Sequence, residues 1–394
     1  MKKLERIAGV LALVAIAAAW VIGTMGPKTE LGPSLRQALP QASEFKPHAD
    51  GVYAGHSPEI ESSPPVGYVA VVQVDGYGGP MRVAVGLDMS GNLTGVSVVD
   101  HKETLPFFNR IKIDNYVKSL VGKGCSDSFI PGADMDAVSG ATVSLNALAT
   151  SLRRGTERAA EGLGIEVYRS EIGDIETGFP EIILVLLFAA GFLTYSKPMT
   201  ANPKARTTMR WVTRLAGLAL LGFVLTIPLS IININSLLLG YWFNLRVSIY
   251  WYLLIVGVFG PLILTDKNTY CQCICPFGAA QDVLKAASKA KLSLPNRLSS
   301  LLRWIQRMLA LTAIITALLY RNPARFDYEI FGTFFTLIGT VAQFALLGVV
   351  LIAAMFLVRP WCNFLCPIRA VSDYIRMLRL WGKDTFTKRP NTKA

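Results

Sequence analysis

The chain has 394 residues, of which 52% are hydrophobic and only 17% are charged. Because the apolar residues are gathered into long runs, this composition excludes an ordinary soluble protein and indicates a membrane protein. The net charge of +12 is unevenly divided: residues 26–178 carry 13 Lys and Arg against 19 Asp and Glu, and the rest carries 26 against 8. A uniformly basic chain would suggest nucleic acid as a partner, whereas this division indicates membrane topology and no nucleic acid.

The first apolar run, Ile7–Pro27, contains no charged residue and follows Lys2, Lys3 and Arg6. It is about as long as a membrane-spanning helix needs to be. We therefore predict that residues 1–27 form an N-terminal transmembrane anchor. A signal peptide cleaved after Ala17–Ala19 is the alternative.

Residues 45–165 are predicted to form a globular domain. Val69–Val74, Arg82–Leu87 and Leu93–Val99 are rich in β-branched residues and are separated by turns that contain glycine. A helical pattern follows Thr142, so we expect an α+β fold. The proline-rich stretch Ser57–Pro65 is predicted to be a loop.

Five more apolar segments follow, so the chain is predicted to hold six transmembrane α-helices, with the α+β domain inserted between helices 1 and 2. Residues 179–380 would form the five-helix membrane domain, and residues 381–394 a basic cytoplasmic tail. The run Leu215–Leu245 exceeds one span and should include a turn between Asn233 and Asn244. The five segments are Ile182–Ser196, Leu215–Leu245, Val247–Thr265, Leu301–Tyr320 and Ile330–Val358.

The distribution of basic residues predicts the orientation of these helices. Four segments on one side carry three, five, seven and eight Lys and Arg, while the two short loops on the other side carry three in total. Cytoplasmic loops are enriched in Lys and Arg. Both termini are therefore expected to be cytoplasmic, and the α+β domain extracytoplasmic, in a multi-pass protein of the cell membrane.

Five of the six cysteines lie in two similar turns. Cys271, Cys275 and Pro276 form a C-x-x-x-C-P pattern, which Cys362, Cys366 and Pro367 repeat 91 residues later. Each pattern follows a pair of predicted spans, so the two copies are parallel repeats. Parallel repeats are related by an axis along the membrane normal, which can bring equivalent turns together.

Four thiolates from these turns are thus predicted to hold one centre. An iron–sulfur cluster is favoured, and structural zinc is the alternative, because thiolates suit both. Cys273 is a spare thiol, either a fifth ligand or a packing residue. All three histidines lie in the α+β domain, so the spans lack the axial ligands that a membrane b-type haem needs.

The run Asp136–Thr142, which ends in Ser139-Gly140-Ala141-Thr142, directly precedes the helical pattern. Small residues at a helix start leave backbone N–H groups free for an anion. A helix N-cap is the alternative. The run resembles the flavinylation site of the FMN-binding domain of Rnf and Na+-translocating quinone reductase subunits and of NosR/NirI-type proteins. The upstream motifs Asp50–Tyr53, Gly76–Pro80 and His101–Thr104 extend this resemblance.

This resemblance implies a covalent FMN, joined by a phosphoester to Thr142. Ser139, Gly140 and Ala141 would form the close-approach turn, with Asp136 shaping the site. It further implies that Glu103, Thr104 and Tyr77 line the flavin.

The FMN domain together with paired C-x-x-x-C-P turns resembles NosR/NirI-type membrane proteins and, most closely, the PceC-like family of reductive dehalogenase operons. The resemblance implies a membrane electron-transfer flavoprotein, possessing no catalytic residue of its own, that passes electrons from menaquinol or a cytoplasmic donor through FMN to an extracytoplasmic reductase. Its implied partners are membrane lipid, the menaquinone pool, that reductase (for instance a reductive dehalogenase) and an FAD-dependent flavin transferase. A membrane-bound redox sensor or maturation factor is the alternative.

One difficulty follows from this topology. The cysteine turns are expected at the inner face and the flavin at the outer face, about 30 Å of hydrocarbon apart. Nothing in the sequence provides a relay between them.

Overall fold

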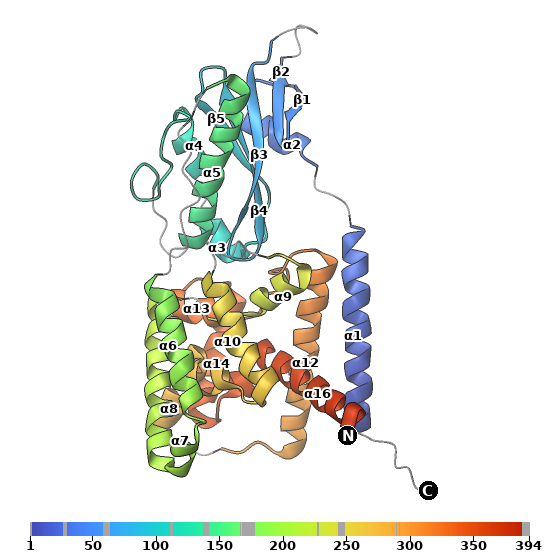
Figure 1. The fold of residues 1–394 in the computed structure, drawn as a ribbon, viewed down its shortest axis with the longest axis vertical. Coiled ribbons are helices and arrows are strands. Elements are labelled where there is room, and N and C mark those ends of the chain that lie inside the picture. Colours follow the sequence, from blue (N-terminus) through green and yellow to red (C-terminus); the bar gives the residue numbers. More distant parts are fainter. Residues whose placement is uncertain are drawn as a thin grey trace.

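In the computed structural model, the chain forms a sheet domain stacked on a helical part (Figure 1). The structure describes residues 2–26, 30–57, 64–110, 113–136, 142–165, 167, 178–226, 228–242, 249–288, 290 and 292–387. Most of the Ser57–Pro65 stretch therefore lies outside the described residues. The antiparallel sheet has the order β1-β2-β3-β4-β5, with strands Glu44–Ala49, Val52–His56, Gly67–Asp75, Pro80–Asp88 and Leu93–Asp100.

Helices cover both faces of this sheet. The long helix α5 (Thr142–Leu163) packs on β3 and β4, and α2 (Gly32–Ala38) packs on β4 and β5. Thr94 anchors α2 by donating a hydrogen bond to the carbonyl of Ala38 at 2.7 Å. The sheet domain therefore includes residues before position 45. Two short helices, α3 (Leu105–Arg110) and α4 (Ile113–Leu120), follow β5.

The helical part contains α1 (Lys2–Thr24) and everything after residue 178. Its C-terminal elements form two similar series, in which an apolar helix leads to a cysteine turn and then to a second helix. The remaining elements are α6 (Phe179–Leu193), α7 (Lys197–Ala201), α8 (Pro203–Gly217), η1 (Leu218–Val224), α9 (Ile231–Leu239), α10 (Ile249–Thr265), η2 (Tyr270–Ile274), α11 (Pro276–Ser288), α12 (Asn296–Leu319), α13 (Phe331–Thr336), α14 (Val341–Phe356), α15 (Pro360–Phe364) and α16 (Pro367–Thr387).

Two helices among the described residues are long and apolar enough to cross a membrane, Glu5–Thr24 and Asn296–Leu319. Three shorter apolar helices, α6, α10 and α14, occupy other predicted segments. The predicted segment Leu215–Leu245 is not a single span: η1 ends at Val224, and α9 starts at Ile231 after a break. Helix α9 thus occupies much of the stretch between Asn233 and Asn244 where the turn was expected, and the break lies before this helix. The six-span topology is not confirmed by helix length.

The first helix is part of the helical bundle. Gly23 of α1 lies so close to α12 that an added Cβ would be 2.0 Å from the carbonyl oxygen of Leu318. An ion pair joins Glu5 to Arg307 at 3.2 Å, and Tyr374 donates a hydrogen bond to the carbonyl of Gly9 at 2.9 Å. The start of α1 and the end of α16 lie at the end of the molecule opposite the sheet domain (Figure 1).

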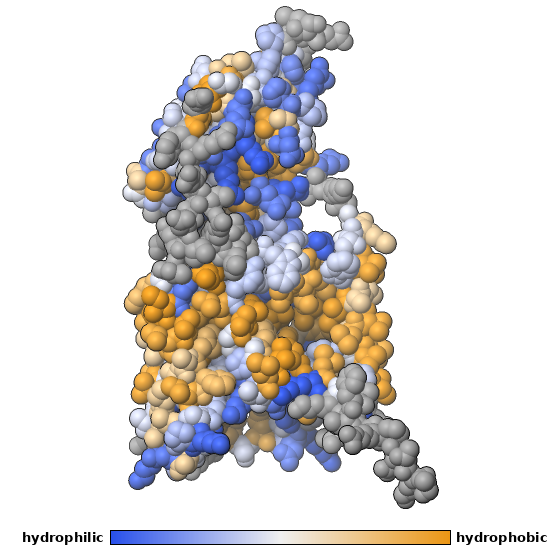
Figure 2. Space-filling view, in the orientation of Figure 1, coloured by the Kyte–Doolittle hydropathy of each residue, from blue (hydrophilic) through white to orange (hydrophobic). Residues whose placement is uncertain are grey.

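Apolar side chains form a band across the helical part on the face that Figure 2 shows. Polar residues gather over the sheet domain and at the opposite end. The two parts also contact each other directly, because Ser236 of α9 donates a hydrogen bond to the carbonyl of Gly78 at 2.8 Å.

Candidate functional site

The two cysteine turns have the same backbone geometry. The N–H of Cys275 donates to the carbonyl of Tyr270 at 2.8 Å, and the N–H of Cys366 donates to the carbonyl of Trp361 at 2.8 Å. In both copies the next residue is a proline that begins a helix, α11 or α16. Proline suits the first helical position, because the N–H that it lacks would have no partner there. The structure therefore contains the internal repeat that the sequence predicts.

The four predicted ligands Cys271, Cys275, Cys362 and Cys366 line one cavity of about 90 Å³. Ligands of a single zinc ion converge to about 2.3 Å from the metal. Within the described residues, no three His, Cys, Asp or Glu side chains converge in that way. The four thiols line a common space, and cysteine thiolates are the ligands of iron–sulfur clusters.

Cys273 belongs to a different environment. Its side chain is fully buried against α6, with Sγ 3.6 Å from Oγ1 of Thr194. It does not line the cysteine cavity. Of the two roles considered for this thiol, the geometry favours packing. Cys125 is also buried, within the sheet domain.

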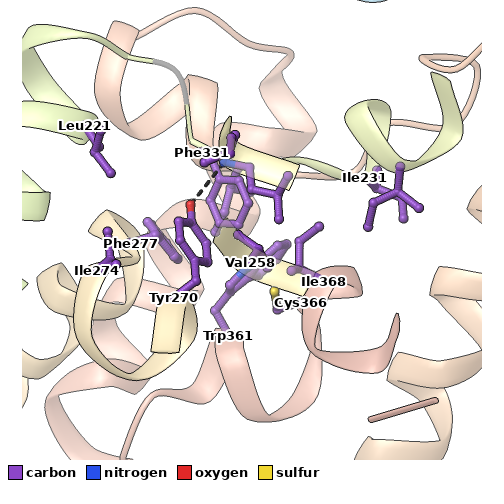
Figure 3. Packing of buried hydrophobic residues seen from close by; sticks show 14 of the residues in the cluster. Leu221, Ile231, Val258, Tyr270, Ile274, Phe277, Phe331, Trp361, Cys366 and Ile368 are labelled. Carbon is purple, nitrogen blue, oxygen red and sulfur yellow. Dashed lines mark hydrogen bonds between the residues drawn. The ribbon is translucent and has the colours of Figure 1, made fainter. Parts of the chain in front are cut away.

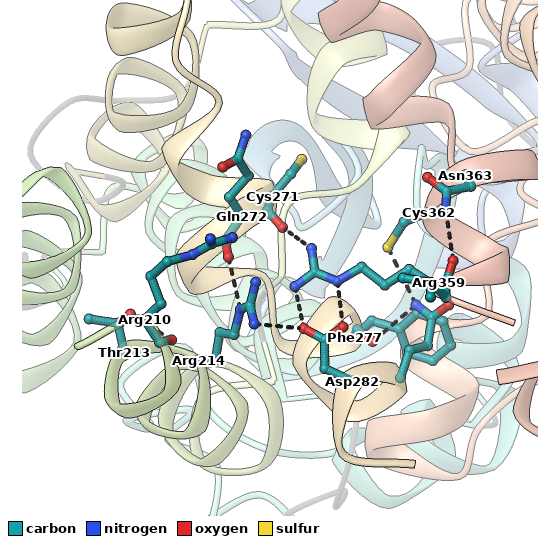
Figure 4. A network of polar contacts seen from close by, with 12 residues as sticks. Arg210, Thr213, Arg214, Cys271, Gln272, Phe277, Asp282, Arg359, Cys362 and Asn363 are labelled. Carbon is teal, nitrogen blue, oxygen red and sulfur yellow. Dashed lines mark hydrogen bonds and ion pairs between the residues drawn. The ribbon is translucent and has the colours of Figure 1, made fainter. Parts of the chain in front are cut away.

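A network of arginines braces the cysteine turns (Figure 4). Arg359 adopts a left-handed backbone conformation with φ of 48° and donates from Nη1 to the carbonyl of Cys271 at 2.8 Å. It also pairs with Asp282, donating from Nε at 2.8 Å. Arg214 pairs with the same carboxylate at 3.1 Å and donates to the carbonyl of Gln272 at 2.9 Å. One half-buried carboxylate thus holds two guanidinium groups against the first cysteine turn.

Two glutamines hold the second turn. Gln281 is fully buried and donates to Sγ of Cys362 at 3.4 Å. Gln306 of α12 donates to the carbonyls of Cys362 and Cys366 at 3.2 and 2.9 Å. Amide donors beside cysteine sulfurs are one means by which proteins set the reduction potential of a cluster.

Aromatic side chains pack together beside Cys366 of the second cysteine turn (Figure 3). Trp361 is fully buried and packs edge-on against Phe277 and Phe331, with ring centroids 6.1 and 5.9 Å away. Tyr270 accepts a hydrogen bond from the N–H of Leu229 at 3.0 Å. The break between η1 and α9 is thereby fixed to the first cysteine turn.

Glu103 is the most buried carboxyl group of the sheet domain, with 2% of its surface exposed. Oγ of Ser144, on α5, donates to it at 2.5 Å, and the N–H of Gly78 donates at 3.3 Å. Burial raises the pKa of Glu103 above its ordinary value. A Cβ at Gly76 would be 2.0 Å from Oε1 of Glu103, and one at Gly78 would be 2.0 Å from the carbonyl of Lys102. Close packing therefore explains these two glycines.

The structure brings some of the predicted flavin residues together. Tyr77, Glu103 and Thr104 line one cavity with Ser144, two residues into α5 from its first residue, Thr142. Asp136 is exposed, and its backbone carbonyl accepts a hydrogen bond from Tyr116 at 2.7 Å. Ser139, Gly140, Ala141 and the side chain of Thr142 lie outside the described residues.

This interdomain cavity has a volume of about 400 Å³ and lies between the sheet domain and the helical part. Its lower wall includes Asp327 and Glu329, on the segment that joins α12 to α13, which the sequence interpretation did not single out. Burial raises the pKa of Asp327 to about 6, and it also raises the pKa of Glu329. Two acidic residues at alternate positions, directly before the apolar segment Ile330–Val358, are the signal that could have identified them.

A thin wall separates the two cavities. Phe331 lines both of them. Pro228 and Ser230 line the interdomain cavity, while Leu229 between them lines the cysteine cavity. The two cavities are therefore not separated by a full thickness of hydrocarbon. The physical reason is that the break before α9 and the short α13 reach into the bundle from the sheet-domain side.

Two family models match parts of this chain. Residues 76–157 match the FMN-binding domain, which covers β4, β5, α3, α4 and most of α5. Residues 247–295 and 340–387 each match the 4Fe-4S binding domain, so that one cysteine turn falls in each match. The double match coincides with the internal repeat.

Several known proteins are similar to parts of the chain. NirI of Paracoccus denitrificans is 24% identical over 224 residues, 53% of this chain and 32% of that protein. A component of the ion-translocating oxidoreductase complex of Vibrio atlanticus is 27% identical over 108 residues, 25% of this chain and 52% of that component. Its counterpart in Erwinia tasmaniensis is 33% identical over 91 residues, 21% of this chain and 43% of the counterpart. The chain thus spans about half or less of these curated relatives.

The two domains and these relatives define a class, the flavin-dependent electron-transfer proteins that carry FMN and an iron–sulfur cluster. Within that class, the chain is an FMN-binding protein similar to NirI.

Proposed function

We propose that this protein is a membrane electron-transfer flavoprotein, in which electrons pass between an iron–sulfur cluster at the four cysteines and a covalent FMN in the interdomain cavity. The observation that carries this proposal is the position of Phe331, one side chain that lines both cavities. Electron carriers need to lie close together, and here the side chain of Phe331 borders both cavities.

Thr142 is the residue we propose for covalent attachment of FMN. It begins α5, and Ser144 one half-turn later lines the cavity. The first N–H groups of a helix lack backbone partners and favour a phosphate. Ser139, Gly140, Ala141 and Asp136 would shape the turn before this helix start. The bound flavin would supply the one- and two-electron chemistry.

For the flavin ring, Glu103, Thr104 and Tyr77 are the lining residues we propose from the sheet domain. Glu103 is held in place by Ser144 and Gly78, so it presents a fixed hydrogen-bonding edge to the cavity. The helical part forms the other side of the cavity.

Menaquinol is the electron donor we propose, with a cytoplasmic donor as the alternative. The cavity edge is apolar and open, because Val224 lines the cavity and is 62% exposed. Leu337 and Val341, next to the lining residues Thr336 and Ile338, are 73% and 87% exposed. Such an edge gives a lipid-soluble quinol a lateral path to a polar interior.

We further propose that the helical part lies in the cell membrane, with six spans and both termini cytoplasmic. Two observations support this orientation: the apolar band on the face of the helical part that Figure 2 shows, and the common end at which α1 starts and α16 ends in Figure 1. Lys and Arg are also concentrated in the segments assigned to the cytoplasm. The sheet domain would then face outward.

An extracytoplasmic reductase is the electron acceptor we propose. The combination of one FMN domain and two cysteine turns resembles PceC-like proteins, which makes a reductive dehalogenase one acceptor to test. Maturation would require an FAD-dependent flavin transferase outside the membrane.

The decisive experiment follows flavin and cluster during addition of a menaquinol analogue to the purified protein. We expect the absorbance of oxidised flavin to bleach, and the EPR signal of a reduced cluster to develop. A flavin that stays oxidised while the cluster is intact would refute electron transfer from quinol. That outcome would favour the alternative, a redox sensor or maturation factor.

A further inference from the structure

The interdomain cavity contains several acidic groups and lacks a basic one. Glu103, Asp327 and Glu329 line it together, and among its described lining residues there is no Lys, Arg or His. The two arginines nearest in the sequence to Asp327 are engaged elsewhere: Arg321 lies over the ring of Tyr241, and Arg325 over the ring of Tyr320, at 5.8 and 4.7 Å.

This charge distribution creates a requirement for any redox group that gains electrons here. A charge in a buried site is costly unless an opposite charge or a proton compensates it. A reduced flavin ring that keeps one negative charge would find three carboxyl groups and no cation among the described lining residues. Uptake of a proton is therefore the means of compensation that these residues offer.

The three carboxyl groups are not equally free to take up this proton. Glu329 accepts the N–H of Ile231 with both carboxylate oxygens, at 3.1 and 3.0 Å. Glu103 accepts Ser144 and Gly78. Asp327 accepts only the N–H of Glu329, at 2.9 Å, in the contacts that the structure gives for its side chain.

We propose that Asp327 is the proton-binding residue that balances the charge of the reduced flavin, an inference that rests on the proposed function. A bound flavin would supply two-electron chemistry: with two electrons from the cluster and one proton, it would hold one negative charge when reduced. The Asp327 carboxylate would then form its own O–H bond with a second proton from water. On reoxidation, both protons and both electrons leave.

The ionisation of Asp327 suits this role. Burial raises the pKa of its carboxyl group to about 6, so the group is mostly ionised at neutral pH while the flavin is oxidised. A new negative charge nearby raises that pKa further, and the carboxylate then binds a proton. The other titratable groups that line this cavity are Glu329 on the same segment, and Tyr77 and Glu103 from the sheet domain; Tyr328 lies between the two acids.

The test is the pH dependence of the flavin midpoint potential, measured on the full-length protein with both cofactors bound. In the wild type we expect two protons per two electrons near neutral pH. In Asp327→Asn only the ring proton remains, so the slope of potential against pH halves. The slopes of the two proteins should converge well below pH 6, where Asp327 is already protonated before reduction.

Two further variants complete the design. Asp327→Glu keeps a carboxyl group and should restore the wild-type slope. Asp88→Asn removes the same charge from the turn after β4, away from the cavity, and should leave the slope unchanged. An unaltered slope in Asp327→Asn would overturn the inference.

Infrared difference spectra of the wild type provide a second measurement, which decides the question even if Asp327→Asn does not fold. Reduction of the flavin should produce the C=O absorption of a newly protonated carboxyl group. Absence of that band, with flavin reduced, would overturn the inference and leave the proposed function intact. A protein that binds no flavin at all would overturn both.

Discussion

Gln281 joins the two cysteine turns by contacting Cys362 across the repeat. Its side-chain amide donates to Sγ of Cys362 at 3.4 Å, and its side-chain oxygen accepts the N–H of Trp361 at 3.0 Å. Gln281 belongs to α11, which follows the first turn, whereas Cys362 and Trp361 belong to the second. A residue of the first repeat thus orients a proposed ligand of the other.

Replacement of Gln281 by Leu should lower the reduction potential of the cluster. A donor beside sulfur stabilises the reduced, more negative state, and hydrogen bonds to charged groups contribute roughly 1.5–3 kcal/mol. Only the difference in hydrogen-bond strength between the two oxidation states changes the reduction potential. We therefore expect a shift on the order of 59 mV, which for one electron corresponds to a tenfold change in the equilibrium constant. An EPR-monitored redox titration measures it. Gln306→Leu, which removes donors to carbonyls and not to sulfur, is the matched control; equal shifts in both variants would contradict this role of the amide.

Thr142→Ala should abolish covalent flavin attachment, because the methyl side chain has no oxygen to form a phosphoester. In-gel flavin fluorescence after denaturation is the measurement. Thr150→Ala, on the same helix, should retain full fluorescence. Equal fluorescence in Thr142→Ala and the wild type would exclude Thr142 as the attachment site.

Gly217→Ala should destabilise the cysteine turns. An added Cβ would lie 2.2 Å from the backbone carbonyl oxygen of Ile274, so α8 would have to move away from η2. Overpacking of this kind costs about 1–3 kcal/mol. The temperature at which cluster absorbance is lost in detergent should fall.

The control for this substitution is Gly348→Ala, at a helical position of α14 with open space around it. There, removal of a helical glycine should stabilise by about 0.5–1 kcal/mol. A similar decrease in both variants would argue against a specific contact between α8 and η2.

The stability of the protein should fall as pH rises from acid to neutral. The pKa of Glu329 is raised in the folded state, so the fold binds more protons than the unfolded chain between the two pKa values. The stabilising contribution of Glu329 is complete below the pKa that this carboxyl group has in the unfolded chain. It is lost as the pH rises through the pKa that the group has in the folded protein. Glu103 and Asp327 act with the same sign, since the pKa of each is also raised.

Glu329→Gln removes the titration while keeping an oxygen that can accept the N–H of Ile231. The decline of melting temperature with pH should therefore be shallower in this variant than in the wild type. Parallel curves for the two proteins would show that Glu329 does not titrate in this range.

Sequence patterns predicted much of the cysteine site. The 91-residue offset between Cys271 and Cys362 identified a repeat, and the structure brings both turns to one cavity. The β-rich runs likewise predicted three strands of the sheet. Such features depend on local spacing, so they can be read from one chain.

The interdomain cavity could not be predicted in the same way. Asp327 and Glu329 belong to no motif, and their proximity to Glu103 depends on how two separately folded parts stack. The sequence also placed the turn of the run Leu215–Leu245 between Asn233 and Asn244 and not at the break before α9, because the residues of that break are themselves mostly apolar. The thin wall at Phe331 is a consequence of that break.

The division of the four cysteines between two repeats has a consequence for biogenesis. In the arrangement we propose, neither half of the helical part can hold the cluster alone, because each supplies two thiols. Cluster insertion must then follow synthesis of α15 and α16, the last elements of the chain that the structure describes. The cluster would therefore join the two repeats as the last step of assembly. A chain truncated before Trp361 should be released from the ribosome without iron.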